Sequence, residues 1–139
     1  MSRELKFFWT GIALYTVSYF LMATAASPPE SGLPGFSCAW LCLVAAPATA
    51  LRFGASELAK QPALYCSATL AGLTNPVFLV AAFLRLAGIM PRAASVLRIT
   101  TLCLIPFGWL AAFLFGEIPR EGNFVWIAGM VLALYSDDI

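Results

Sequence analysis

The chain has 139 residues, 61% of them hydrophobic and only 11% charged, with a formal net charge of +1. Soluble domains carry about 25% charged residues, and so short a chain cannot bury this much apolar surface in a core of its own. The composition therefore indicates an all-α integral membrane protein whose apolar surface contacts membrane lipids. The near-neutral charge excludes a nucleic-acid partner, which needs a basic face. Residues 1–139 are expected to form one polytopic membrane domain.

The first predicted helix covers residues 7–26, a run of 20 residues without a charged side chain. At about 1.5 Å per residue this run reaches about 30 Å, the thickness of the hydrocarbon core of a bilayer. A signal peptide is the alternative, because Arg3 and Lys6 precede the run and Ala23-Thr24-Ala25 resembles a cleavage site. The run is longer than the usual signal core of about 7–15 residues, which favours a membrane helix.

The second predicted helix covers residues 36–51. It follows residues 27–35, where three prolines and two glycines cannot continue a helix. At the usual helical rise the second helix reaches only about 24 Å, so it needs a locally thin bilayer. Pro47 is expected to kink it.

The third predicted helix covers residues 64–87 and contains the longest uncharged run, from Leu64 to Leu84. Pro76 removes a backbone hydrogen bond near its middle. We therefore expect a helix break at Asn75 and Pro76 in the form of a kink closed by neighbouring helices, rather than exposed half-helix ends that bind a ligand or ion. The alternative is a re-entrant segment that folds back at this pair, but exposed non-helical backbone is unfavourable in lipid. The length of the run favours a full span.

The fourth predicted helix covers residues 91–115 and starts at Pro91, because a proline at the first helical position loses no hydrogen bond. The fifth covers residues 124–136 and reaches only about 20 Å, so it is expected to be a short membrane helix. The predicted fold is a compact bundle of four transmembrane helices plus this fifth short C-terminal membrane helix.

The distribution of cations predicts the orientation. With five spans and a cytoplasmic N-terminus, the cytoplasmic side holds Arg3, Lys6, Arg52, Lys60 and Arg120. The opposite side then holds Arg85, Arg92 and Arg98, and the positive-inside rule prefers this arrangement. These three arginines are expected to contact lipid headgroups or a partner protein. For so compact a chain we expect a prokaryotic inner (cytoplasmic) membrane.

Charged residues are absent from the apolar runs, and the chain contains no histidine. Ion-coupled carriers need a titratable group within the membrane, and hydrolysis at membrane depth needs an acid, a base or a metal. We therefore expect no catalytic residue, no metal site, no cofactor and no enzymatic activity.

The four cysteines are Cys38, Cys42, Cys66 and Cys103. Cys38 and Cys42 are four residues apart and share one helix face. We interpret all four as small apolar packing residues. A Cys38–Cys103 disulfide and a metal or redox site are the alternatives.

Two patterns mark candidate contact surfaces. Small residues at a spacing of four let helices approach closely in lipid, and they predict helix packing or partner binding at Ala68, Gly72, Gly108, Ala112, Gly116, Gly129 and Ala133. A stripe on the first helix could contact a hydrophobic ligand or serve hydrogen bonding between helices. Its residues are Gly11, Tyr15, Ser18 and Met22.

The sequence therefore predicts a small, non-catalytic membrane protein that acts through association of helices. Its partner would be another membrane protein or a second copy of the chain. The expected role is an accessory subunit of a larger membrane complex or an immunity-type inhibitor of a membrane-inserting partner. The alternative is a passive oligomeric channel or facilitator for an uncharged solute.

Overall fold

The computed structural model describes residues 2–21, 23–25, 34–45, 47–48, 51–52 and 60–135. Within these residues the regular structure is helical, apart from two short strands that pair with each other. The elements are the helices α1 (Arg3–Ser18), α2 (Gly35–Trp40), α4 (Pro62–Ala87), α5 (Pro91–Leu114) and α6 (Glu121–Tyr135), the π-helix η2 (Leu41–Ala45), and the strands β1 (Thr24–Ala25) and β2 (Ile118–Pro119).

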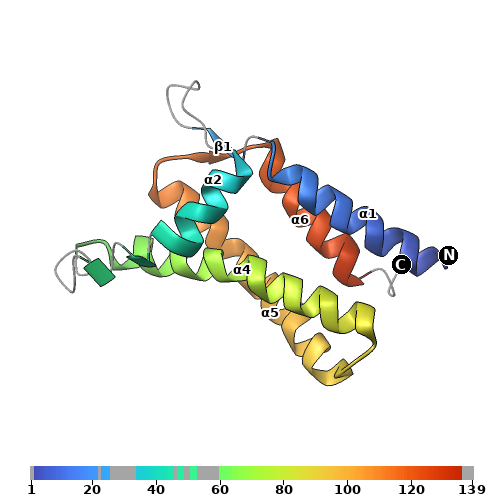
Figure 1. The fold of residues 1–139 in the computed structure, drawn as a ribbon. Coiled ribbons are helices and arrows are strands. Elements are labelled where there is room, and N and C mark those ends of the chain that lie inside the picture. The colour runs from blue at the N-terminus through green and yellow to red at the C-terminus, as the bar shows by residue number, and fades with distance from the viewer. Residues whose placement is uncertain are drawn as a thin grey trace.

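The long helices form two antiparallel pairs, α4 with α5 and α1 with α6 (Figure 1). The backbones of α1 and α6 touch, because a Cβ added at Gly129 would lie 2.5 Å from the backbone nitrogen of Tyr15 and 2.8 Å from the carbonyl oxygen of Gly11. The π-helix η2 lies against the first half of α4, where Gly72 faces the carbonyl of Cys42. The two strands pair antiparallel, with Thr24 opposite Pro119.

Two of the described helices, α4 with 26 residues and α5 with 24, are long and apolar enough to cross a membrane. The other described helices are shorter than a bilayer is thick, since α1 has 16 residues and α6 has 15. An all-helical fold is therefore confirmed, whereas a bundle of four membrane-crossing helices is not.

The first helix differs from the prediction at both ends. It starts at Arg3, because the Ser2 side chain caps it by accepting a hydrogen bond from the Leu5 amide at 3.3 Å. It ends at Ser18 rather than at residue 26, and the chain then turns. Backbone amides from the start of α2 satisfy the carbonyls beyond this end, with Phe36 donating to Tyr19 at 3.1 Å and Gly35 to Leu21 at 3.0 Å.

The second predicted helix, residues 36–51, is instead a short α-helix that widens into the π-turns of η2. Pro47 provides a reason, because a proline clashes with the carbonyl four residues before it in an α-helix, and π-turns commonly accompany such irregularities. Residues 46, 49 and 50 of the prediction lie outside the described residues.

The third helix, α4, runs without interruption through Asn75 and Pro76. The re-entrant alternative is therefore wrong and the pair does not interrupt the helix, whereas a kink at the pair stays a prediction. Proline at this position is tolerated because η2 and the neighbouring helices pack closely around this part of α4. The helix ends at Ala87, as predicted for residues 64–87, where Gly88 adopts the left-handed conformation with φ of +66°.

The last two helices agree closely with the predicted residues 91–115 and 124–136. Helix α5 starts at Pro91 and ends at Leu114. Helix α6 starts earlier than predicted, at Glu121, and is described to Tyr135, while residue 136 lies outside the described residues.

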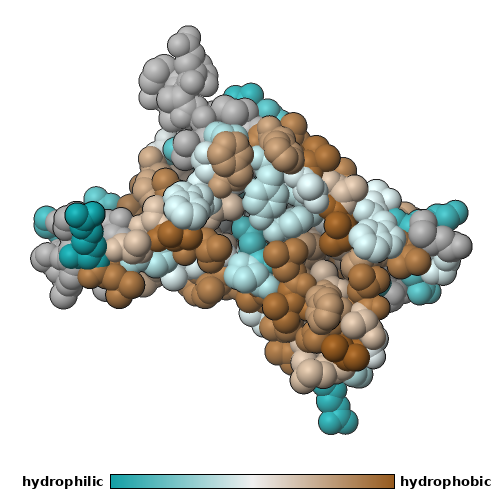
Figure 2. Space-filling view, viewed as in Figure 1, coloured by the Kyte–Doolittle hydropathy of each residue, from teal (hydrophilic) through white to brown (hydrophobic). Residues whose placement is uncertain are grey.

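One apolar core joins α1, α4 and α6, and its largest fully buried side chains are Phe78, Met130 and Leu134. The remaining apolar side chains face outward. Figure 2 shows hydrophobic side chains spread over the surface of α4 and α5, with hydrophilic ones gathered at the extremities of the molecule. The two longest helices therefore expose their apolar faces although the chain is folded.

The start of α1 lies beside the end of α4. Arg85 of α4 donates a hydrogen bond to the carbonyl of Ala133 and stacks over the ring of Phe8, with 5.7 Å between the guanidinium carbon and the ring centroid. The predicted orientation put Arg85 and the N-terminus on opposite sides of the membrane. In the fold Arg85 lies beside the start of α1, and α1 ends at Ser18 after 16 residues.

Candidate functional site

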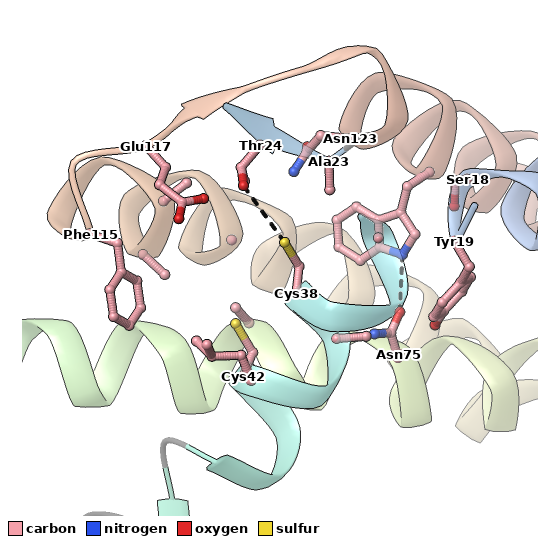
Figure 3. A pocket seen from close by; sticks show the side chains of 18 residues that line it. Ser18, Tyr19, Ala23, Thr24, Cys38, Cys42, Asn75, Phe115, Glu117 and Asn123 are labelled. Carbon is pink, nitrogen blue, oxygen red and sulfur yellow. Dashed lines mark hydrogen bonds between the residues drawn. The ribbon is translucent and has the colours of Figure 1, made fainter. Parts of the chain in front are cut away.

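A cavity of about 120 Å³ lies between the two helix pairs, next to the paired strands (Figure 3). Helices α1, α2, α4, α5 and α6 and the π-helix η2 all contribute to its wall, and most of the lining surface is apolar. The lining residues are Ser18, Tyr19, Ala23, Thr24, Gly35, Cys38, Ala39, Leu41, Cys42, Ala71, Asn75, Gly108, Ala111, Ala112, Phe115, Glu117, Asn123 and Trp126.

Small side chains on α4 and α5 keep this cavity open. Ala71, Ala111 and Ala112 are buried, and each contributes only a methyl group to the wall. A Cβ added at Gly108 would meet no heavy atom within 4 Å. A methyl group at Gly108 would therefore lie in open space.

Asn75 holds three helices together at the inner end of the cavity. Its Oδ1 accepts a hydrogen bond from the indole Nε1 of Trp126 at 3.0 Å and another from the hydroxyl of Tyr15 at 3.1 Å. The Tyr15 hydroxyl also lies 2.7 Å from the hydroxyl of Tyr19. An indole N–H can only donate, so the amide oxygen and not the amide nitrogen must face Trp126. The pair that was expected to break α4 thus joins it to α1 and α6.

Glu117 brings a carboxylate to the opposite end of the cavity. After α5 ends, Gly116 turns the chain with a φ of +76°, a conformation that favours glycine. The amide of Glu117 then donates to the carbonyl of Ala112 at 2.8 Å, which fixes the residue at the cavity wall. Figure 3 shows its side chain pointing into the cavity.

The carboxylate of Glu117 has no hydrogen bond or ion pair in the part of the chain that the structure describes. The nearby Glu121, which does not line the cavity, differs. Its Oε2 accepts from Nε of Arg120 at 3.0 Å. The backbone amide at the start of α6, together with this guanidinium, lowers the pKa of the Glu121 carboxyl.

Two thiols lie in the wall between these ends. The sulfur of Cys38 is 3.9 Å from Oγ1 of Thr24, and Cys42 follows one turn later. None of the four cysteines forms a disulfide, so the Cys38–Cys103 bond is wrong. Among the described residues no cluster of His, Cys, Asp and Glu has the arrangement of a metal site.

The predicted small residues divide between packing and other roles. Ala68 packs against Ala111 in the α4–α5 pair, Gly72 against η2, and Gly129 and Ala133 against Gly11 of α1. Ala112 is buried and lines the cavity, as Gly108 does. Gly116 lies beyond the end of α5, so its predicted helix-packing role is wrong.

The residues of the predicted ligand stripe on α1 lie in different surroundings in the fold. Gly11 is packed against α6, and Tyr15 is buried in the core and hydrogen-bonded to Asn75. Ser18 lines the cavity, with its hydroxyl donating to the Tyr15 carbonyl at 2.6 Å. Met22 lies outside the described residues. The cavity therefore takes in only the last turn of this stripe.

The predicted arginine cluster is also divided. Arg85 points inward to Ala133 and Phe8, and Arg98 lies over the ring of Tyr135 at 4.2 Å from its centroid. Arg92 is exposed. The fold thus uses two of these cations for contacts within the chain.

Sequence reasoning missed Glu117, Thr24 and Asn123 as cavity residues. The available signal for Glu117 was its position just after an apolar helix and a glycine. Thr24 reaches the site through the pairing of β1 with β2, which no local pattern predicts. The assembled site combines apolar walls, one carboxylate, two thiols and side-chain amides, an arrangement suited to binding a small molecule.

No family model matches the chain, and neither a curated protein nor a solved structure is similar to it.

Proposed function

We propose that the chain is a small, non-catalytic integral membrane protein that acts through association of its helices with another membrane protein. The α4–α5 pair would cross the membrane and present its outward faces to lipid and to the partner. The role of an accessory subunit, or of an immunity-type inhibitor of a membrane-inserting protein, fits this proposal.

The observation that carries the proposal is the exposure of the two longest apolar helices. A core helix of a soluble protein would be mostly buried, whereas only 33% of the most apolar part of α4 and 17% of that of α5 are buried within the chain. Exposed side chains include Leu79 and Phe83 on α4 and Ile99 and Phe113 on α5. Apolar surface on this scale needs a lipid or protein neighbour.

The charges support an orientation with the N-terminus in the cytoplasm, and the membrane we propose is the inner membrane of a prokaryote. Because the start of α1 lies beside the end of α4, five cations gather at that end of the molecule: Arg3, Lys6, Arg85, Arg92 and Arg98. The three remaining cations of the chain are Arg52, Lys60 and Arg120, of which Lys60 and Arg120 lie at the other end of the hairpin. The positive-inside rule then assigns the α4–α5 turn to the cytoplasm and Gln61 to the opposite side.

Photo-crosslinking from the outward face tests the proposal. A photoreactive phenylalanine analogue at Phe83, which is 63% exposed, should give one discrete protein adduct in the native membrane. The same analogue at the fully buried Phe78 should give none, because it reaches only atoms of its own chain. Lipid adducts alone from Phe83 would contradict a protein partner.

Solute flux separates this proposal from a facilitator. The purified full chain in liposomes should pass glycerol or urea no faster than empty vesicles do. Rapid flux of either solute would support an oligomeric pore for uncharged solutes and would contradict a purely associative role.

A further inference from the structure

The cavity beside the strands has a charged end, a polar end and an apolar wall between the two. One end carries the carboxylate of Glu117, which lies beyond the last turn of α5. The other end is Asn75, in the middle of α4, where the amide oxygen already accepts two hydrogen bonds. The wall between these ends is largely apolar and built from small side chains.

We propose that this cavity binds a small lipophilic organic cation, with an ammonium group at the carboxylate of Glu117 and an apolar body against the small side chains of α4 and α5 that line the cavity. The inference is independent of the proposed function, because it concerns the interior of the fold rather than its outward faces.

Charge determines the class of ligand. A carboxylate in a partly apolar cavity gains most from a cationic partner, and the described residues supply no cation to Glu117. The Phe115 ring lies on the same side of the cavity as Glu117 (Figure 3), and an aromatic face also attracts an ammonium group. A neutral hydroxyl would gain a hydrogen bond but no charge pairing.

Size limits the apolar body. A cavity of about 120 Å³ is close to the cavity of about 150 Å³ that admits benzene in a known apolar core. One aromatic ring or a short branched alkyl group therefore fits, whereas a sterol or a full acyl chain does not. If α4 and α5 cross the membrane, Glu117 lies near the interface and the ring enters toward the bilayer centre, as an amphiphile does.

Three probes of the same size test the proposal on the full chain in nonionic micelles, with affinity measured by ligand-detected NMR. Benzylammonium should bind more tightly than benzyl alcohol, and benzoate should bind most weakly. Glu117→Gln should weaken benzylammonium binding about tenfold or more, since a charge-assisted hydrogen bond is lost. It should leave benzyl alcohol binding within about twofold.

Two further variants control for indirect effects. Glu121→Gln changes a neighbouring carboxylate that does not line the cavity, and it should leave all three affinities unchanged. Gly108→Leu adds a larger side chain at a residue that lines the cavity and should weaken binding of both benzylammonium and benzyl alcohol, with circular dichroism checking that helix content is retained. Equal binding of benzylammonium and benzyl alcohol would overturn the proposal, as would an unchanged affinity in Glu117→Gln or in folded Gly108→Leu.

Discussion

Trp126 donates its indole N–H to Oδ1 of Asn75 at 3.0 Å, and this bond joins α6 to α4 across a separation of 51 residues. The same oxygen accepts the Tyr15 hydroxyl of α1 at 3.1 Å. Both donors are partly or fully buried, where an unsatisfied polar group is unfavourable. One amide therefore fixes the position of three helices around the cavity.

Replacing Asn75 by leucine should lower the free energy of unfolding by about 2–4 kcal/mol. Leucine has a similar size but leaves the Trp126 N–H without its acceptor, which costs about 1–3 kcal/mol. It also removes one hydrogen bond of the Tyr15 hydroxyl, worth about 1 kcal/mol, although that hydroxyl can still donate to Tyr19. Denaturant unfolding in micelles, followed by circular dichroism, measures the change. As a control, Asn123→Leu removes a single acceptor, that of the Trp109 indole, and should cost less. Equal stability of Asn75→Leu and the parent protein would contradict the role of the amide.

Substitution by alanine should have opposite effects on stability at two glycines, Gly129 inside the contact between α1 and α6 and Gly108 outside it. Gly129→Ala should destabilise the protein by about 1–3 kcal/mol, because the new methyl group would meet backbone atoms of Gly11 and Tyr15. Gly108→Ala should stabilise it by about 0.5–1 kcal/mol, because it adds helix propensity in open space. Melting temperatures in the same detergent give the comparison. A similar loss in both variants would contradict the close approach of α1 and α6.

The ends of α4 and α5 could be predicted because their signals are local. Pro91 at a first helical position and Gly88 after a last one define the turn between these helices. The true end of α1 could not be predicted. Residues 7–26 are uncharged throughout, and the turn after Ser18 is held by distant amides, those of Gly35 and Phe36, which donate to carbonyls beyond the end of α1.

The candidate site was less predictable than the helices. The four-residue spacing located several packing positions but gave no indication of which helix each would face. Gly72 meets η2, whereas Gly129 meets α1. Glu117 and Thr24 lie far apart in the sequence and reach the same cavity through strand pairing, so hydropathy alone could not identify them.

Replacement of Thr74 by an apolar residue should stabilise the fold. It is fully buried, and within the described residues its hydroxyl oxygen has no hydrogen-bond partner. Thr74→Val keeps the shape and removes the unsatisfied group, so the free energy of unfolding should rise by about 1 kcal/mol. Thr101 is equally buried, but its hydroxyl donates to the Leu97 carbonyl at 2.8 Å. Thr101→Val should therefore give no gain, and the reverse ranking would contradict this assignment.

Arg85 and Arg92 should differ although the sequence groups them together. Arg85→Gln removes the contact with the Ala133 carbonyl and the cation–π contact with Phe8, and it should destabilise the protein by about 1–3 kcal/mol. Arg92 is exposed, so Arg92→Gln should change stability by no more than about 0.5 kcal/mol. Thermal unfolding in zwitterionic detergent compares the two. Equal effects would favour headgroup contacts for both.

The most direct test of the membrane assignment is labelling of single cysteines in intact cells with a membrane-impermeant maleimide. Four variants without the native cysteines carry one cysteine each, at Ser2, Gln61, Gly88 or Arg120. Ser2→Cys and Gly88→Cys should react only after the cells are permeabilised, because the start of α1 lies beside the end of α4 and both are expected on the cytoplasmic side. Gln61→Cys and Arg120→Cys should react from outside. Labelling of Gln61→Cys and Gly88→Cys from the same side would contradict a membrane-crossing α4.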